Sequence, residues 1–400
     1  MIHNFTVENF YSINEEQELD FTSKKKYSNS FTEYEDRYIS NINCFIGANA
    51  SGKTNIFKAL HFLLWYAQMS YYDMVGSYEA LFDQHKLNKN KDTKFSLTFD
   101  NNNKLYKYEL VLSQKEIIEE TLSTKAEKGY SYLYKLKNSD GSIEITYNRY
   151  NDLSKINSNE ENRFKLKKNV TFLSFLLGTG YLEKLGLKEI TSSIFSNVSN
   201  VDSRSYDHVS ESIYLSRALE KSEFKNELIP YLRSFDFGIE DFAQDESFKI
   251  QFDNGTTQQI IGFKHANNGQ SFLLSAIDES AGTVKGTFLL LNLIKVLSKG
   301  GTAIIDEVDA RLHYDIVRKL ISLFANKETN KYNAQLFFST HQPLFLNDRD
   351  KKQIFLCEKE DYLNTEVYRL DEIEGVRNTE NFFEKYLSGT YGATPRIGDV

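Results

Sequence analysis

Residues 47–54 combine two glycines, a lysine and a threonine at a fixed spacing. The run Gly47-Ala48-Asn49-Ala50-Ser51-Gly52-Lys53-Thr54 matches the pattern G-x-x-x-x-G-K-[ST] at every fixed position. Glycines let such a loop curl until its N–H groups point at phosphate oxygens, and the following helix adds the positive end of its dipole. We expect Lys53 to reach the β- and γ-phosphates of ATP and the Thr54 hydroxyl to hold Mg²⁺. The predicted nucleotide-binding residues are this run and Asn55.

A second group of residues lies where an apolar strand ends in two acids. Thr302-Ala303-Ile304-Ile305 has the composition of a buried strand, and Asp306 and Glu307 follow it directly. The carboxyl ends of parallel strands share one edge of a sheet, where ligands bind. Asp306 is predicted to hold Mg²⁺, and Glu307 to act as general base toward the attacking water. Without the glycine loop, two solvated acids at a strand end would be the simpler interpretation.

A third group ends the next predicted strand. Phe337-Phe338-Ser339-Thr340 leads into His341, one helix and one strand after the acid pair. An imidazole at this edge of the sheet can hydrogen-bond a γ-phosphate or the attacking water. We therefore predict a catalytic set of Lys53, Glu307 and His341, although an isolated histidine at a strand end is more often structural.

The predicted elements place these residues as such a site requires. Residues 38–46 are rich in strand formers and end at Gly47, and apolar residues recur at helical spacing over 56–67. Alternating apolar and polar residues over 94–147 indicate an antiparallel meander. Helices and strands alternate over 284–356, which implies parallel strands joined by crossover helices.

These patterns predict an α/β fold: a mixed sheet, an antiparallel β-lobe and a helical insertion. With 400 residues the chain exceeds what one ordinary core supports. We expect an N-terminal lobe over 1–150 with the glycine loop and the meander, and a helical insertion over 151–242, including a helix at Tyr181–Phe195. A C-terminal lobe over 243–400 would carry Asp306, Glu307 and His341.

Composition limits the classes of protein to which the chain can belong. Hydrophobic residues make up 40%, enough for a core, and the net charge of −8 gives no overall attraction to nucleic acid. Cys44 and Cys357 lack metal-binding spacing, which favours a reducing compartment. The N-terminus lacks a signal-peptide pattern, and the apolar stretch Phe288–Ile294 is too short to span a bilayer. We expect a cytoplasmic protein without a membrane partner.

The order of these motifs resembles that of ABC-type ATPases, and more narrowly the RecF, SMC, Rad50 and OLD-like branch. The resemblance also rests on Glu279-Ser280-Ala281-Gly282-Thr283 and on the segment 306–313. It implies a P-loop NTPase fold in which Ser280 and Gly282 contact the γ-phosphate bound to a second copy in a head-to-tail dimer. His341 takes the position of the switch histidine. Three residues differ from those usual in the broad family: Ala281, Thr283 and His313.

Softer similarities point to a group of compact bacterial ATPases. They lie in residues 5–10, in residues 117–122 and in the segment Gly389-Thr390-Tyr391-Gly392-Ala393-Thr394-Pro395. Members of that group occur in abortive-infection and other anti-phage systems, commonly beside a separate effector such as a nuclease or toxin. The resemblance therefore implies an ATPase that switches such an effector and forms a homodimer or higher oligomer through shared ATP sites.

Three alternatives stay open. A DNA repair or recombination ATPase of RecF or SMC type would clamp DNA, so nucleic acid is a possible partner. The motor subunit of a membrane transporter suits the β-lobe and the insertion less well. A scaffold that binds ATP without hydrolysing it would show the same glycine loop, and a steady-state ATPase assay separates it.

Overall fold

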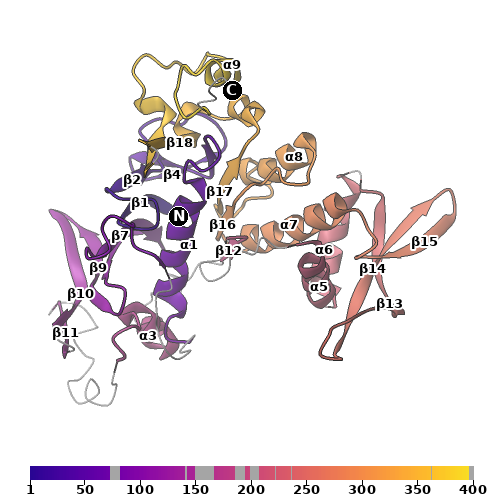
Figure 1. The fold of residues 1–400 in the computed structure, drawn as a ribbon, viewed down its shortest axis with the longest axis horizontal. Coiled ribbons are helices and arrows are strands. Elements are labelled where there is room, and N and C mark those ends of the chain that lie inside the picture. The colour runs from indigo at the N-terminus through magenta and orange to yellow at the C-terminus, as the bar shows by residue number, and fades with distance from the viewer. Residues whose placement is uncertain are drawn as a thin grey trace.

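The computed structural model describes residues 1–72, 82–139, 142–148, 166–184, 194–198, 207–220, 222–235, 237–361 and 363–395. Two large sheets form the body of the molecule, and a third sheet projects from it as an arm (Figure 1). No helix in the described ranges is long and apolar enough to cross a membrane.

A six-stranded sheet carries the predicted motifs. Its strands are β6 (Ile42–Ile46), β12 (Ile194–Ser196), β16 (Thr302–Ile305), β17 (Gln335–Thr340), β18 (Ile354–Glu360) and β19 (Asn364–Arg369). The spatial order is β12-β16-β17-β6-β18-β19, and all neighbours are parallel except β18 and β19. The parallel sheet predicted from the alternation of helices and strands is confirmed.

A seven-stranded antiparallel sheet forms the β-lobe. Its strands are β1 (Ile2–Glu8), β2 (Gln17–Asp20), β7 (Thr93–Asn101), β8 (Lys104–Leu112), β9 (Ile117–Ala126), β10 (Gly129–Ser139) and β11 (Ser142–Tyr147). Strands β7 to β11 pair in sequence order, so the predicted meander is confirmed. A small sheet lies beside it, formed by β3 (Thr22–Ser23), β4 (Phe31–Tyr34) and β5 (Arg37–Ser40).

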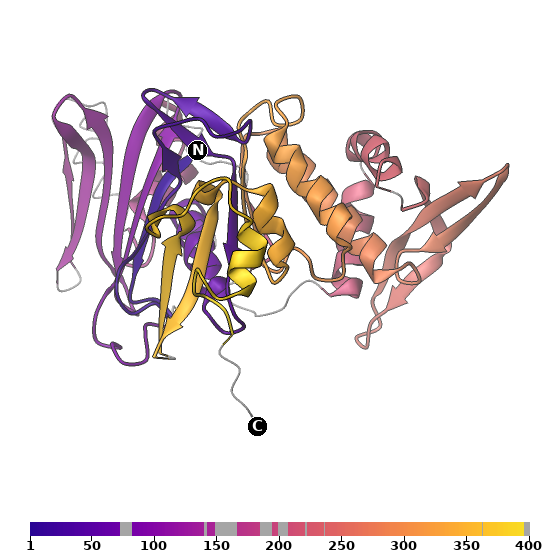
Figure 2. The same cartoon turned by 90° about the horizontal axis from the view of Figure 1, so that it is seen from above.

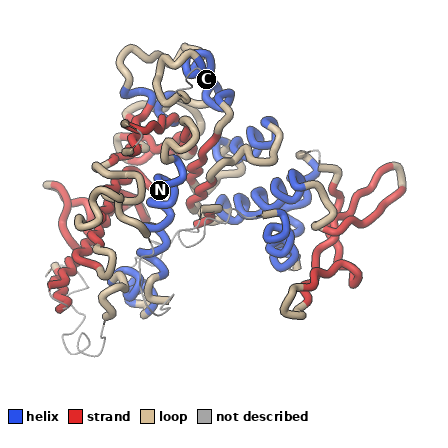
Figure 3. Tube along the Cα trace, viewed as in Figure 1, coloured by secondary structure: helices blue, strands red, loops and turns tan. Residues whose placement is uncertain are grey.

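Helices cover both faces of the six-stranded sheet, as Figure 3 shows. Helix α1 (Lys53–Met69) packs between this sheet and the β-lobe, in a core that includes Phe45 and Phe337. Helices α7 (Ala281–Leu297) and α8 (Tyr314–Ala325) share a second core with alternate residues of the same strands, such as Phe338. Because successive strand side chains point to opposite faces, each strand contributes to both cores.

The arm lies at the end of α7 far from the six-stranded sheet (Figures 1 and 2). Its sheet consists of β13 (Ile239–Gln251), β14 (Thr257–Asn267) and β15 (Gln270–Ser275). Helices α5 (His208–Leu219) and α6 (Ser222–Arg233) join it to α7.

The prediction of a helical insertion over 151–242 is partly wrong. Residues 151–165, 185–193 and 199–206 of that range lie outside the described residues. The described parts include the helices α3 (Phe172–Gly178), α4 (Tyr181–Lys184), α5 and α6. However, Ile194–Ser196 is not the end of a helix but strand β12, which pairs with β16, and β13 begins already at Ile239. Three residues are too few to show a strand period, so sequence alone did not separate them from a helix.

Candidate nucleotide-binding site

The sheet brings the predicted catalytic residues to one edge. Strand β17, which leads to His341, lies between β6, which leads to the glycine loop, and β16, which leads to Asp306 and Glu307. All three strands are parallel, so their carboxyl ends coincide. A cavity of about 720 Å³ is formed there by residues 49–55 together with Asp306, Glu307 and His341.

The loop needs glycine at two positions. At Gly47 a Cβ would lie 2.1 Å from the carbonyl oxygen of Cys357 on β18. At Gly52 the backbone has φ +102°, and a Cβ would lie 2.0 Å from Thr365 Oγ1. A side chain at either position would displace a neighbouring strand, so the curled loop depends on both glycines.

Several features of the loop suit an anionic ligand. Gly52 is the N-cap of α1 and has no side chain to accept a hydrogen bond from the helix N–H groups, which leaves these donors for a ligand. The buried Ser51 hydroxyl has no partner among the described residues. Burial lowers the pKa of Lys53, and the nearby Asp306 and Glu307 oppose this effect. A phosphate chain fits this donor set.

The ammonium group of Lys53 lies over the loop. Its Nζ donates hydrogen bonds of 2.9 Å to the carbonyl oxygens of Gly47 and Ala48. Because Lys53 is also the first residue of α1, the helix start and the loop place its charge inside the cavity.

Asp306 is held by hydrogen bonds on all sides. Its carboxylate accepts a 2.6 Å bond from Thr54 Oγ1 and another from the Ser339 hydroxyl. The side-chain amide of Asn197 donates to the Asp306 carbonyl oxygen at 2.8 Å and accepts from its N–H at 2.7 Å. Sequence reasoning missed Asn197, and it gave no structural role to Ser339.

Glu307 has a strained backbone and an open carboxylate. Its φ of +50° lies in the left-handed region, which is unfavourable for a residue with a side chain, and its N–H donates to Ser339 Oγ at 2.8 Å. The side chain is 58% exposed, and Oε1 lies 3.7 Å from His341 Nε2. An acid and an imidazole thus face each other at the cavity mouth.

Asn55 lines the cavity, but its amide is engaged elsewhere. The Nδ2 atom donates a 2.6 Å hydrogen bond to Ser12 Oγ, which in turn lies 2.7 Å from Thr365 Oγ1. Asn55 therefore ties the start of α1 to the β-lobe.

Ser280 and Gly282 do not line this cavity. Ser280 caps the N-terminus of α7, where its Oγ accepts from the Thr283 N–H at 3.0 Å. Gly282 lies against the segment that follows Glu307, because a Cβ there would come within 2.9 Å of the Arg311 carbonyl oxygen. Within one chain, the segment Glu279–Thr283, here called the signature loop, therefore lies apart from the cavity beside the glycine loop.

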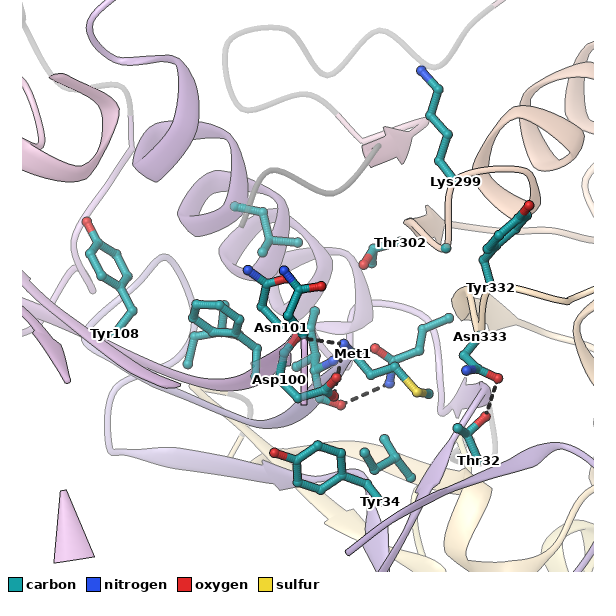
Figure 4. Close-up of a pocket in the computed structure, with 18 of the residues that line it drawn as sticks. Met1, Thr32, Tyr34, Asp100, Asn101, Tyr108, Lys299, Thr302, Tyr332 and Asn333 are labelled. Atoms are coloured by element: carbon teal, nitrogen blue, oxygen red, sulfur yellow. Dashed lines mark hydrogen bonds and ion pairs between the residues drawn. The ribbon is translucent and has the colours of Figure 1, made fainter. Parts of the chain in front are cut away.

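Another cavity, of about 670 Å³, lies at the opposite edge of the sheet (Figure 4). It is lined by Thr302 and Gln335, the first residues of β16 and β17, and by Met1. The N-terminal ammonium of Met1 is paired with Asp100 Oδ1 at 3.1 Å. No predicted site residue lines this cavity, so the predicted chemistry belongs to the other edge.

A family comparison covers the residues of this arrangement. Residues 42–347 match the family model described as "AAA domain, putative AbiEii toxin, Type IV TA system". A similar solved structure is the SMC head domain from Thermotoga maritima, with 16% identity, a TM-score of 0.42 and coverage of 92% of this chain and 98% of that chain. The chain has no significant match among curated proteins. Because the family match spans most of the chain and includes the glycine loop, the acid pair and His341, the chain belongs to this AAA domain family.

Proposed function

We propose that the chain binds and hydrolyses ATP at the cavity beside the glycine loop and acts as a nucleotide-driven switch in bacterial anti-phage defence. The observation that carries the ATPase assignment is the meeting of Lys53, Thr54, Asp306, Glu307 and His341, which follow three different strands, around one cavity. The description of the family, which names a toxin and a toxin–antitoxin system, supports the defence role and a separate effector partner.

Each residue has a distinct part in this proposal. Lys53 neutralises phosphate charge, while Glu307 accepts a proton from the attacking water and His341 orients it. Thr54 and Asp306 are placed to hold Mg²⁺, which supplies further charge neutralisation when bound. No cluster of three or more His, Cys, Asp or Glu side chains in the described ranges is arranged to hold a metal ion, so phosphate oxygens would complete the coordination.

The position of Ser280 and Gly282 supports a shared site. Both belong to the start of α7, at the end of that helix near the arm, and neither lines the cavity of its own chain. By the resemblance to ABC-type ATPases, they would cap the ATP held by a second copy. ATP would then close a homodimer and hydrolysis would open it, which converts nucleotide state into a signal for the effector.

A steady-state ATPase assay tests the core of the proposal. The wild-type chain is expected to release phosphate from Mg-ATP, and Lys53→Ala is expected to lose binding and hydrolysis together. Equal turnover in the two proteins would assign the activity to a contaminant. Addition of DNA separates the roles, because salt-sensitive stimulation of hydrolysis would favour a DNA-clamping ATPase over a defence switch.

A further inference from the structure

A second cavity adjoins the glycine loop on the side of β18. It has a volume of about 950 Å³. It shares Asn49, Ala50, Ser51 and His341 with the cavity that Asp306 and Glu307 line. Its opposite wall is formed by α9 (Phe382–Leu387) and by the segment that follows this helix. Because the two cavities meet at the same loop residues, a ligand anchored by its phosphates can extend from one into the other.

The segment Tyr391–Pro395, here called the C-terminal strap, is bound directly to the loop. The N–H of Ala48 donates a 3.0 Å hydrogen bond to the carbonyl oxygen of Ala393. The same oxygen accepts a 3.0 Å bond from the Tyr386 hydroxyl, and the Ala393 N–H donates to Glu358 Oε2 at 3.0 Å. Hydrogen bonds to the glycine loop, to α9 and to β18 therefore hold Ala393 in place.

Two successive residues of the strap have a left-handed backbone conformation. Gly392 has φ +74°, and a Cβ there would lie 2.6 Å from the Tyr368 hydroxyl and 3.1 Å from Glu358 Oε2. Ala393 has φ +56°, also in the left-handed region. A backbone held in this region against close neighbours is specified by its surroundings rather than by local preference.

The order of the strands assigns a direction to the bound nucleotide. Asp306, Glu307 and His341 follow β16 and β17, which lie on one side of β6, whereas β18 lies on the other. A triphosphate whose terminal phosphate faces the acids therefore carries its nucleoside toward β18. In Figure 1, α9 lies near β18.

We propose that the C-terminal strap and α9 form the wall of a pocket for the nucleoside of ATP bound at the glycine loop. This inference rests on the proposed ATPase function. Leu387, Pro343 and Pro395 supply apolar surface for the flat base, and Glu358, Lys359 and Thr394 supply polar groups for its edges and the sugar. A strap of five residues thus makes the far end of the chain part of the nucleotide site.

The test compares two ligands that differ only in having a nucleoside. Affinities for adenylyl imidodiphosphate and for inorganic tripolyphosphate, both with Mg²⁺, are measured by calorimetry. Leu387→Ser removes a cavity-lining side chain that is 59% exposed, so the fold is retained. Leu363→Ser is the matched control, because Leu363 is 56% exposed, lies in the turn after β18 and does not line the cavity.

We expect Leu387→Ser to weaken binding of the analogue about three- to tenfold while tripolyphosphate affinity stays within about twofold. Leu363→Ser should change neither. Equal weakening of both ligands by Leu387→Ser would mean that the residue acts through the loop, and no difference from the control would mean that the base lies elsewhere; either result overturns the proposal. Failure of wild type to bind either ligand would instead overturn the ATPase assignment.

A glycine pair tests the strap itself. Gly389→Ala and Gly392→Ala introduce the same backbone strain, at φ +75° and +74°, but at Gly389 the nearest atom to an added Cβ is 3.6 Å away. Only in Gly392→Ala does the added methyl group collide with Tyr368 and Glu358 and push the strap away from them. This variant should therefore bind the analogue severalfold more weakly than Gly389→Ala does. Equal affinities in the two variants would show that the strap position does not matter for the nucleotide.

Discussion

The Thr54 hydroxyl donates a 2.6 Å hydrogen bond to the carboxylate of Asp306, across 252 positions of sequence. This bond joins the first turn of α1 to the end of β16, the two places from which a P-loop enzyme holds Mg²⁺. The second carboxylate oxygen of Asp306 accepts from the Ser339 hydroxyl, so the group is held from both sides. These two hydrogen bonds fix the orientation of the carboxylate.

Asp306→Asn removes the charge while keeping the shape of the side chain. Affinity for adenylyl imidodiphosphate should fall at least about tenfold in Mg²⁺, because the metal loses an anionic partner, and stay unchanged in EDTA. Calorimetry under both conditions measures this. Asp315→Asn, on the exposed first turn of α8, is the control. If Mg²⁺ tightens binding equally in both variants, Asp306 does not hold the metal.

Glu307→Gln leaves the site intact but removes the proton acceptor. Hydrolysis should fall at least about 100-fold, and an ATP-bound dimer should accumulate, which light scattering in ATP detects. Glu328→Gln, an exposed acid outside the cavity, should behave as wild type. An unchanged turnover in Glu307→Gln would remove Glu307 from the role of general base.

The regular elements around the site could be predicted because their signals are local. Thr302–Ile305 is an apolar run closed by two acids, and it forms a strand with the predicted bounds. Tyr314–Ala325, within the predicted alternation of helices and strands, is an amphipathic helix capped by His313. Likewise the glycine loop lies between strand and helix as its pattern requires. Each of these features is determined by residues within a few positions of one another.

Contacts between distant residues left no such signal. Asn197 holds Asp306 from 109 positions away and directly follows a three-residue strand that shows no periodicity. The bond between Ala48 and Ala393 joins two backbones, so no side-chain type reveals it. The segment Gly389–Pro395 carries a resemblance in its sequence, yet its place beside the glycine loop follows only from the tertiary structure.

Glu120→Gln should destabilise the β-lobe. The buried Glu120 carboxylate accepts hydrogen bonds from the hydroxyls of Tyr108 and Tyr134, at 3.1 and 2.6 Å, and from the N–H groups of Phe172 and Leu173, at 2.6 and 3.0 Å. A glutamine amide has one acceptor oxygen and directs an NH₂ group at the remaining donors. We expect a loss of about 2–4 kcal/mol in the free energy of unfolding, measured in urea.

The neighbouring acid provides the control for this loss. Glu119 lies on the same strand, but it is exposed and paired with Lys137 at 2.9 Å. Glu119→Gln should change the free energy of unfolding by no more than about 0.5 kcal/mol. Similar losses in the two variants would show that the buried hydrogen bonds of Glu120 do not carry the effect.

His61 should make stability depend on pH. Burial lowers the pKa of His61 on α1 to about 4, below the 6.5 of an exposed histidine. The unfolded chain therefore binds a proton at His61 more tightly than the folded chain does. The stabilisation of the fold by neutral His61 is fully present above about pH 6.5 and is lost as the pH falls toward 4. Compared with His61→Leu, wild type should lose about 2 kcal/mol more between about pH 7.5 and pH 5 in urea unfolding. A difference that does not change with pH would exclude this origin.

Mixing two inactive variants tests the shared site most directly. Lys53→Ala disables the glycine loop, and Ser280→Arg blocks the signature loop at the start of α7. In a head-to-tail dimer of one variant with the other, the intact loop of one subunit meets the intact signature of its partner, so one of the two sites is whole. If half of the dimers are mixed, activity should return to about a quarter of wild type. Lys53→Ala mixed with the double variant has no whole site and should stay inactive. A mixture no more active than its components would place Ser280 in the site of its own chain.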